Sequence, residues 1–380
     1  MKTIYTFGGV APLTCHAFSA DQRQIALSKN NNQVEIHEQS GSGPNGDKFA
    51  LKDTLDQHDL RVNGIDWAPQ TNRIVTCSAD RNAYVWTQQP NGTWKHTLVL
   101  LRINRAATCV KWSPKENKFA IGSGARLISI CYFEADNDWW LAKHVKKPIK
   151  STITALDWHP NNCLVAAGSS DFKVRVFSGY VKDIEDKPSP TPWGSKMPFA
   201  HLMTEFSNSL HGGGWVHAVS FSADGTKLAW AGHDSSLSVA DATKGLTIFK
   251  LKTAHLPLLS CLWVSPSTII AAGHDCTPLV FNVDGAGQVS FVSKLEEDKK
   301  GDGGPAKFSA KALFQNKDRT GQSEVADTVL NTTHQNQISC IQIVKGNKDR
   351  ADVISTSGGD GKLVLWDLRT IEKQMKGLKL

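Results

Sequence analysis

The chain has 380 residues, of which 40% are hydrophobic and 21% are charged, and its formal net charge is +7. A moderate positive charge suits acidic partners, but it is too dispersed to indicate a nucleic-acid-binding protein. The longest uncharged stretch, 253–274, contains Pro257 and Pro266, so we do not expect it to insert into a membrane. The N-terminal residues lack the apolar core of a signal peptide.

The eight cysteines include no CxxC pair and no spacing typical of a metal site. Cysteines of this kind usually pack as small apolar residues in proteins from reducing compartments. We therefore expect no metal, no cofactor and a cytoplasmic location.

One pattern recurs seven times along the chain. Each copy contains an apolar anchor, and the residue three positions before the anchor is small. A fixed small residue indicates that a neighbouring strand packs closely there, and an internal repeat outranks any local interpretation. The anchors are Phe18, Trp67, Trp112, Trp158, Phe221, Val264 and Ile343, and the small residues are Cys15, Gly64, Cys109, Ala155, Ala218, Cys261 and Cys340.

Each copy consists of short runs of β-branched and aromatic residues, bounded by Asn, Asp, Gly and Pro. These runs predict three strands, and most copies add a fourth, such as 94–101 and 247–252. Four strands in each repeat is the arrangement of a β-propeller blade. The sequence therefore predicts an all-β protein in which residues 1–380 form a single seven-bladed propeller.

The two ends of the chain are expected to meet. The last copy ends at Trp366 and Asp367, and the residues that follow are poorly patterned for a strand. Residues 3–7, TIYTF, are β-branched and aromatic. We predict that they form the outer strand of the last blade, so that sheet edges are paired across the chain ends.

Basic residues cluster in the turns and loops of the second and third copies. Asp80 is expected to cap a turn by bonding nearby backbone amides, which leaves its neighbour Arg81 free to face a partner. If these cations share one propeller face, they form a surface for acidic peptides; the alternative is an ordinary solvated surface. The set comprises Arg81, Arg102, Arg105, Arg126, Lys146 and Lys147, with Lys150 close by.

The first of two overlong gaps, 178–215, falls between blades 4 and 5 and is rich in proline. Proline makes such a segment extended and stiff. Trp193, Met197 and Phe199 are its candidate anchors. They either contact a partner or pack along the side of the propeller itself.

The second gap, 285–337, falls between blades 6 and 7 and is polar, charged and glycine-rich. Within it Pro305 suits the start of a short helix, with Phe308 and Leu313 on one face. We expect a flexible arm that binds a partner through this amphipathic helix, with plain disorder as the alternative. Its candidate contact residues are Lys307, Phe308, Lys311, Leu313 and Phe314.

Three strings resemble pieces of enzymes, but none has the context that catalysis requires. GSGPNG at 41–46 contains a proline and precedes a strand, whereas a dinucleotide-binding loop must open a helix. HGGGW at 211–215 resembles an oxyanion-hole motif, yet the chain contains no G-x-S-x-G nucleophile elbow. Asp136 and Asp138 sit in a hairpin that enters an outer strand. We therefore do not expect an enzyme.

The repeat resembles the WD-repeat propellers, whose blades carry a His in the connecting loop, an Asp in a turn and a Trp-Asp pair at the end of the third strand. His58, His255 and His334 occupy the expected loops, and the full pair is present as Trp366-Asp367 in the last copy only. The signature is degenerate, but the repeat spans nearly the whole chain.

Longer strings are more specific. The segments at 102–140, 191–199 and 212–230 resemble the WD-repeat subunit family, subunit 1, of the actin-related protein 2/3 complex. The resemblance implies a place in a seven-subunit assembly that contains two actin-related proteins and nucleates branched actin filaments at the cortical cytoskeleton. It also implies contacts with the acidic tails of nucleation-promoting factors and, through the arm, with the mother filament. An unrelated propeller adaptor, such as a substrate receptor of a ubiquitin ligase, is the alternative.

Overall fold

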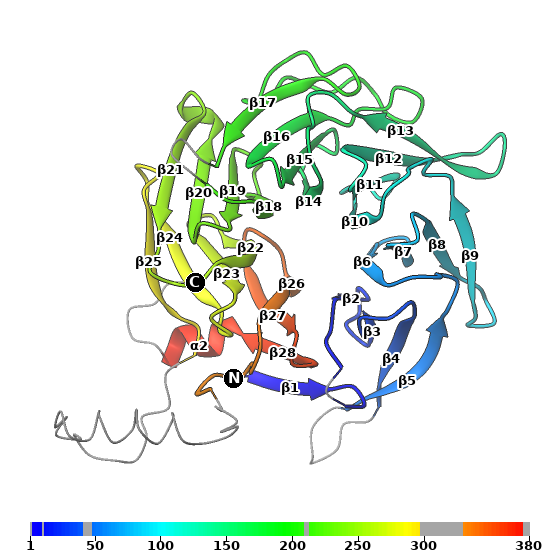
Figure 1. The fold of residues 1–380 in the computed structure, drawn as a ribbon, viewed down its shortest axis with the longest axis horizontal. Helices are drawn as coiled ribbons and strands as arrows, with labels where there is room; N and C mark the ends of the chain where they lie inside the picture. The colour runs from blue at the N-terminus through cyan, green and yellow to red at the C-terminus, as the bar shows by residue number, and fades with distance from the viewer. Residues whose placement is uncertain (1, 10, 41–47, 209–212, 297–329, 375–380) are drawn as a thin grey trace.

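In the computed structural model, which describes residues 2–9, 11–40, 48–208, 213–296 and 330–374, the described strands form seven four-stranded antiparallel blades arranged in a ring (Figure 1). The predicted seven-bladed propeller is therefore confirmed. Blades 2 and 3 are joined through their outer strands into one eight-stranded sheet. None of the helices in the described ranges is long and apolar enough to cross a membrane.

The strands follow the chain from the innermost to the outermost position of each blade, apart from blade 7. Blades 1 to 3 are β2 (Cys15–Phe18), β3 (Gln24–Ser28), β4 (Val34–Ser40) and β5 (Lys48–Leu55); β6 (Val62–Trp67), β7 (Arg73–Ser78), β8 (Ala83–Gln88) and β9 (Trp94–Val99); and β10 (Ala107–Trp112), β11 (Lys118–Ser123), β12 (Leu127–Glu134) and β13 (Trp139–Val145).

Blades 4 to 6 have the same order, with the short helix η1 (Ala242–Lys244) between the last two strands of blade 5. They are β14 (Ile153–Trp158), β15 (Leu164–Ser169), β16 (Lys173–Ser178) and β17 (Leu202–Ser207); β18 (Val216–Phe221), β19 (Lys227–Gly232), β20 (Ser236–Asp241) and β21 (Thr247–Lys252); and β22 (Leu258–Ser265), β23 (Thr268–Gly273), β24 (Leu279–Val283) and β25 (Val289–Lys294).

Blade 7 closes the ring with both ends of the chain. Its inner strands are β26 (Ile338–Gly346), β27 (Ala351–Gly358) and β28 (Lys362–Asp367), and its outer strand is β1 (Lys2–Thr6). β1 lies antiparallel to β28, with Ile4 opposite Val364. The predicted closure is confirmed, with the strand one residue nearer the N-terminus than expected.

The innermost strands explain the recurring small residue. An added Cβ at Gly64 would lie 3.1 Å from both the sulfur of Cys77 and a methyl carbon of Val110 in the next blade. Contacts at that distance leave no room for a larger side chain. The small residue recurs in the sequence because neighbouring blades approach each other closely at this position around the ring.

Polar contacts reinforce the junction between blades 1 and 7. His16 is fully buried, and its two ring nitrogens contact the hydroxyls of Ser357 at 2.8 Å and Ser355 at 2.7 Å. Gln342 also donates to the carbonyl of His16 at 2.5 Å. Burial, followed by the charge of Lys111, lowers the pKa of His16 to about 3, so this histidine is neutral in the folded protein.

Both overlong gaps contain the outer strand of a blade. The range 178–215 includes β17, so the extra residues precede the outer strand of blade 4 instead of following it. The range 285–337 likewise begins with β25 of blade 6. Outer strands are exposed along one edge, and their sequences therefore repeat less regularly than those of the inner strands.

The proline-rich segment packs on the propeller. Trp193 and Met197 are buried, and the Trp193 indole donates to the carbonyl of Gly225 in blade 5 at 2.7 Å. Phe199 is partly buried against the apolar cluster of blades 3 and 4. Of the two interpretations of these anchors, the structure supports packing within the chain, and Trp193 and Met197 are not exposed to a partner.

The last described residues form a helix that the sequence pattern did not indicate. α2 (Leu368–Gln374) follows β28 directly, and the Asp367 carboxylate accepts from the backbone and hydroxyl groups of Thr370. Such a contact satisfies a free amide at a helix start. Leu368 and Ile371 pack into the apolar cluster of blades 6 and 7, which explains why a short helix forms here.

Candidate acidic-peptide interface

The basic set lies on one face of the propeller. In a four-stranded antiparallel blade, the connection to the next blade and the turn between the second and third strands fall on the same side. We call this side the connector face. Arg81 and Arg126 lie in such turns, whereas Arg102, Arg105, Lys146, Lys147 and Lys150 lie in the connections that follow β9 and β13.

A buried polar network fixes the turn that carries Arg81. His58 donates to Asp80 at 2.8 Å and contacts the Thr76 hydroxyl at 2.9 Å, and the Trp86 indole donates to the same hydroxyl at 3.0 Å. The Asp80 carboxylate also accepts from the amide of Asn82 at 2.8 Å. Asp80 therefore caps the turn as expected.

The charge on Asp80 is stabilised by these contacts. Burial raises its pKa, but the hydrogen bonds from His58 and from the Asn82 amide outweigh burial, so the pKa of Asp80 lies below its usual value. The Asp80 carboxylate is occupied by its hydrogen bonds to His58 and to the Asn82 amide, so it does not neutralise Arg81.

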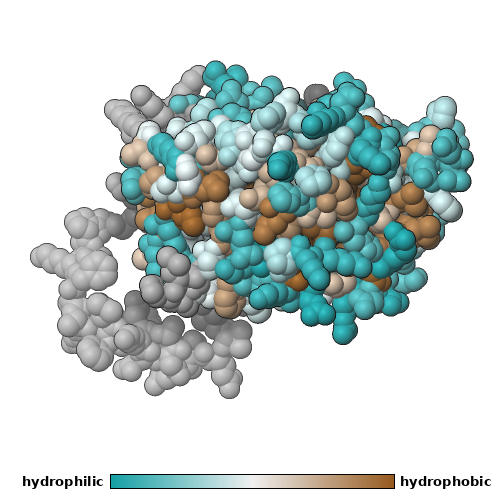
Figure 2. All heavy atoms as spheres, turned by 90° about the horizontal axis from the view of Figure 1, so that it is seen from above, coloured by the Kyte–Doolittle hydropathy of each residue, from teal (hydrophilic) through white to brown (hydrophobic). Residues whose placement is uncertain are grey.

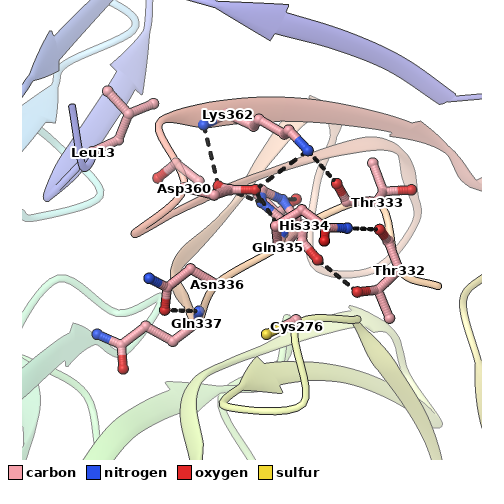
Figure 3. A network of polar contacts seen from close by, with 12 residues as sticks. Leu13, Cys276, Thr332, Thr333, His334, Gln335, Asn336, Gln337, Asp360 and Lys362 are labelled. Atoms are coloured by element: carbon pink, nitrogen blue, oxygen red, sulfur yellow. Dashed lines mark hydrogen bonds and ion pairs between the residues drawn. The ribbon is translucent and has the colours of Figure 1, made fainter. Parts of the chain in front are cut away.

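Blade 7 repeats this network around His334 (Figure 3). The imidazole of His334 lies 3.0 Å from Asp360, as Figure 3 shows. It also lies 2.8 Å from the Thr356 hydroxyl, to which the Trp366 indole donates. The sequence showed a Trp-Asp pair in this blade only. Blade 2 nevertheless builds the same network, because Trp86 performs the role of the tryptophan without an acid after it.

The turn between the second and third strands needs one residue with positive φ in every blade. Blades 2 and 3 place arginines there, Arg81 with φ of 73° and Arg126 with φ of 59°. Both arginines are exposed at the tips of their turns. The residues at this position are Asn30, Arg81, Arg126, Phe172, Ser235, Cys276 and Gly361.

Three of the predicted cations converge on one hollow. Arg102, Arg126 and Lys146 line a pocket of about 530 Å³ on blade 3. Arg102 is oriented by a hydrogen bond to the carbonyl of Ala142 at 2.6 Å. The pocket is therefore a concave, positively charged site whose cations are presented by three separate loops.

Sequence reasoning missed the other residues of this pocket. His144 and Asn104 add polar groups, whereas Ile103, Leu127 and Ile149 supply apolar walls. Burial lowers the pKa of His144, and the charges of Lys146 and Arg102 lower it further against an opposing hydrogen bond to Leu101. The only sequence signal for these pocket residues was that they lie close in the chain to the predicted cations.

The other predicted cations, Arg81, Arg105 and Lys147, are not part of the pocket lining. Arg105 packs beside the turn of Arg126, since a Cβ on Gly124 would lie 3.3 Å from that of Arg105. Arg81 lies in the turn of the preceding blade, and Lys147 follows Lys146. Within the described ranges, none of the six predicted cations has a carboxylate partner at ion-pair distance.

The predicted arm residues Lys307, Phe308, Lys311, Leu313 and Phe314 lie outside the described residues, as does 41–46. The structure does describe how the two ends of the arm are held. Glu296 accepts from the Thr333 amide at 3.0 Å and from Lys2 at 2.8 Å. The arm therefore leaves and re-enters the propeller at one clamped point.

The fold defines a WD-repeat propeller, and the connector face of its blades 2 and 3 carries a cluster of basic residues. A family model described as WD domain, G-beta repeat matches residues 49–87 and 142–178. The first match begins in the outer strand of blade 1 and ends in blade 2, and the second spans blades 3 and 4 in the same way.

Whole-chain relatives narrow the family further. The chain is 54% identical over 369 residues, covering 97% of both chains, to actin-related protein 2/3 complex subunit 1A-A of Xenopus laevis. It is 45% identical to subunit 1 of Schizosaccharomyces pombe, covering 93% of this chain and 96% of the relative, and 36% identical to subunit 1B of Arabidopsis thaliana over 96% of each. The chain belongs to the actin-related protein 2/3 complex subunit 1 family.

Proposed function

We propose that this protein is the non-catalytic propeller subunit of a complex that contains two actin-related proteins and nucleates branched actin filaments. Similarity along nearly the whole chain to relatives named as subunits of that complex supports the assignment. Purification of the tagged protein tests it. Two actin-like polypeptides should co-elute, whereas ubiquitin-ligase subunits in their place would favour the adaptor alternative.

Within this assembly, the connector face of blades 2 and 3 binds the acidic tails of nucleation-promoting factors. The observation that carries the proposal is the convergence of Arg102, Arg126 and Lys146 on one pocket without a carboxylate partner among the described residues. A tail rich in Asp and Glu would supply the missing anions, and electrostatic attraction would guide its approach.

Reversing three of these charges should weaken tail binding. In the variant Arg102→Glu, Arg105→Glu, Arg126→Glu, we expect affinity for a synthetic acidic tail peptide to fall about tenfold or more, equivalent to at least about 1.4 kcal/mol. The remaining binding should depend less on salt, because fewer ion pairs are left to screen. Fluorescence anisotropy at several salt concentrations measures both effects.

A matched control reverses exposed cations on the opposite face, Lys115→Glu, Lys187→Glu and Arg350→Glu. This control changes net charge by the same amount and should bind the peptide much more tightly than the pocket variant. Exposed charges contribute little to stability, so both variants should fold. If the two variants bound the peptide with equal affinity, the loss of affinity would come from net charge alone. That result would contradict a specific binding site.

The arm is proposed to contact the mother filament. Changing Phe308, Leu313 and Phe314 to Ser should leave the propeller folded and the assembly intact, because the described strands of all seven blades lie outside 297–329. Loss of their burial, about 1.5–3 kcal/mol for each side chain at most, should lower docking to existing filaments. Branch density measured by fluorescence microscopy should fall; wild-type branching would contradict the proposal.

A further inference from the structure

The junction between blades 2 and 3 leaves part of a strand edge open. β9 pairs with β8 along its whole length, and its other edge meets β13 in parallel at a single pair, Val99 and Trp140. Within the described residues, no strand lies beside the earlier part of that edge, from Trp94 to Leu98. An open edge presents unpaired amide and carbonyl groups, which makes it a template for another strand.

A groove follows this open edge. It has a volume of about 530 Å³ and lies between β9 and the β12–β13 hairpin, with Leu98 on one side and Phe133 on the other. Figure 1 shows the hairpin projecting outward from the ring next to β9. The groove is lined by β9 and the β12–β13 hairpin, which the sheet joins at one end only, and also by Tyr84 of β8 and Gln57 in the connection before β6.

Large apolar side chains are concentrated around the groove. Leu98 and Leu100 are each 43% exposed, Trp139 is 42% exposed and Phe133 is 36% exposed. Figure 2 shows the propeller edge-on from the side of β13, β16 and β17, where apolar residues likewise lie between two more hydrophilic faces. Of these four, Leu98 and Phe133 line the groove itself, and exposed apolar side chains gathered in a groove indicate a site of interaction.

The charges around the groove differ on its two sides. Lys95 and His96 of β9 line one wall, whereas Asp138 lines the other. Asp136 and Asp138 are both exposed at the hairpin tip, and within the described residues neither has an ion-pair partner. Glu134 is already bonded to Asn137 and to the Trp139 indole. The hairpin wall is thus locally acidic in a chain of net charge +7.

We propose that this groove binds an extended segment of a neighbouring subunit, which adds as a strand to the open edge of β9. The inference rests on the proposed assembly. The occupant carries apolar side chains that cover Leu98 and Phe133, and a Lys or Arg that faces Asp136 and Asp138. Its backbone pairs with the edge, as β13 already does at Val99.

Other occupants fit the surface less well. A helix would cover the apolar side chains but leave the amide and carbonyl groups of β9 without strand partners. A symmetric contact with the groove of a second copy would bring that copy's acidic hairpin toward Asp136 and Asp138, and like charges repel. The acidic wall also opposes approach to an anionic membrane. A basic, extended segment meets each requirement.

Cross-linking in the purified, assembled complex tests the location. A photoreactive p-benzoylphenylalanine replaces Leu98, and the cross-linked peptides are identified by mass spectrometry. We expect one dominant cross-link to a segment of another subunit that carries apolar and basic residues. The matched control places the same group at Leu51, which is 58% exposed on the outer strand of blade 1. Absence of an intersubunit cross-link at Leu98, or an equal yield at Leu51, would overturn the proposal.

A second measurement uses retention of the subunit in the complex. The variant Leu98→Glu, Phe133→Ser should dissociate at least tenfold more readily on dilution, and Asp136→Lys, Asp138→Lys should show a smaller, salt-dependent loss. The control Leu51→Glu should be retained like the wild type. Thermal unfolding of the free propeller is measured for every variant, because Phe133 also packs on the ring of Trp140, and retention is compared only between variants that unfold at the wild-type temperature.

The outcomes separate the two proposals. If the wild-type chain fails to co-purify with actin-like subunits, the proposed function is wrong. If the wild type assembles normally and the rim variants assemble equally well, only the strand-addition site is wrong.

Discussion

Replacing Glu185 by Gln is expected to destabilise the propeller by about 3–5 kcal/mol, because it leaves a buried ammonium without its counter-charge. Lys118 of β11 is fully buried, and its ammonium pairs with the Glu185 carboxylate in the proline-rich segment. Glu185 also accepts from the side chain of Asn162 at 2.9 Å and from the amide of Val181 at 3.1 Å. Denaturant unfolding followed by tryptophan fluorescence measures the loss.

The pH dependence of this variant provides a second signature. Burial lowers the pKa of Lys118 to about 7 in the wild-type protein, and removing the Glu185 carboxylate should lower it further. A lysine whose pKa is lower in the folded state than in the unfolded state binds fewer protons when folded. The variant should therefore gain stability as the pH rises from neutral toward the ordinary lysine value near 10.4.

The double variant Lys118→Met, Glu185→Gln is the control. Removing both charges abolishes the unpaired ammonium, so most of the lost stability should return, and the added pH dependence should disappear. A loss below about 1 kcal/mol in the single variant, or no recovery in the double variant, would show that the pair is solvated in the folded protein.

The inner part of each blade was predictable because packing repeats there. The small residues at positions such as Gly64 and Cys109 are required wherever neighbouring blades approach closely, and a sevenfold coincidence revealed them. The outer strands were harder to place. β17 and β25 lie inside segments interpreted as insertions, since an edge strand has one exposed side and needs no fixed residue type.

The candidate interface was predictable in its chemistry but not in its shape. Loop positions indicated that Arg102 and Arg126 face solvent, and charge indicated an acidic partner. Their convergence with Lys146 depends on the angle between neighbouring loops, which no local pattern encodes. For Trp193 the sequence could not decide between two interpretations. An aromatic residue among prolines looks the same in the sequence whether it binds a partner or packs on its own propeller.

Lowering the pH from 8 to 5 is expected to cost the protein about 2 kcal/mol of stability through His16 alone. The pKa of His16 falls from 6.5 to about 3 on burial. A histidine with a depressed pKa binds fewer protons folded than unfolded, so its contribution is fully present above pH 6.5 and declines as the pH falls toward 3. pH 5 lies about 1.5 pH units below the unfolded pKa of 6.5, and each unit lowers the stability contribution of His16 by about 1.36 kcal/mol.

The variant His16→Gln isolates this contribution. The amide can still donate and accept toward Ser355 and Ser357, which keeps the junction of blades 1 and 7 bonded, but it does not titrate. At pH 8 the variant should be less stable than the wild type, because its geometry is less suited to both hydroxyls. At pH 5 the difference in free energy of unfolding between the wild type and the variant should shrink by about 2 kcal/mol.

Replacing the exposed His96 by Gln is the matched control. Urea unfolding at the two pH values gives the comparison, and an unchanged gap would mean that His16 is protonated in the folded ring.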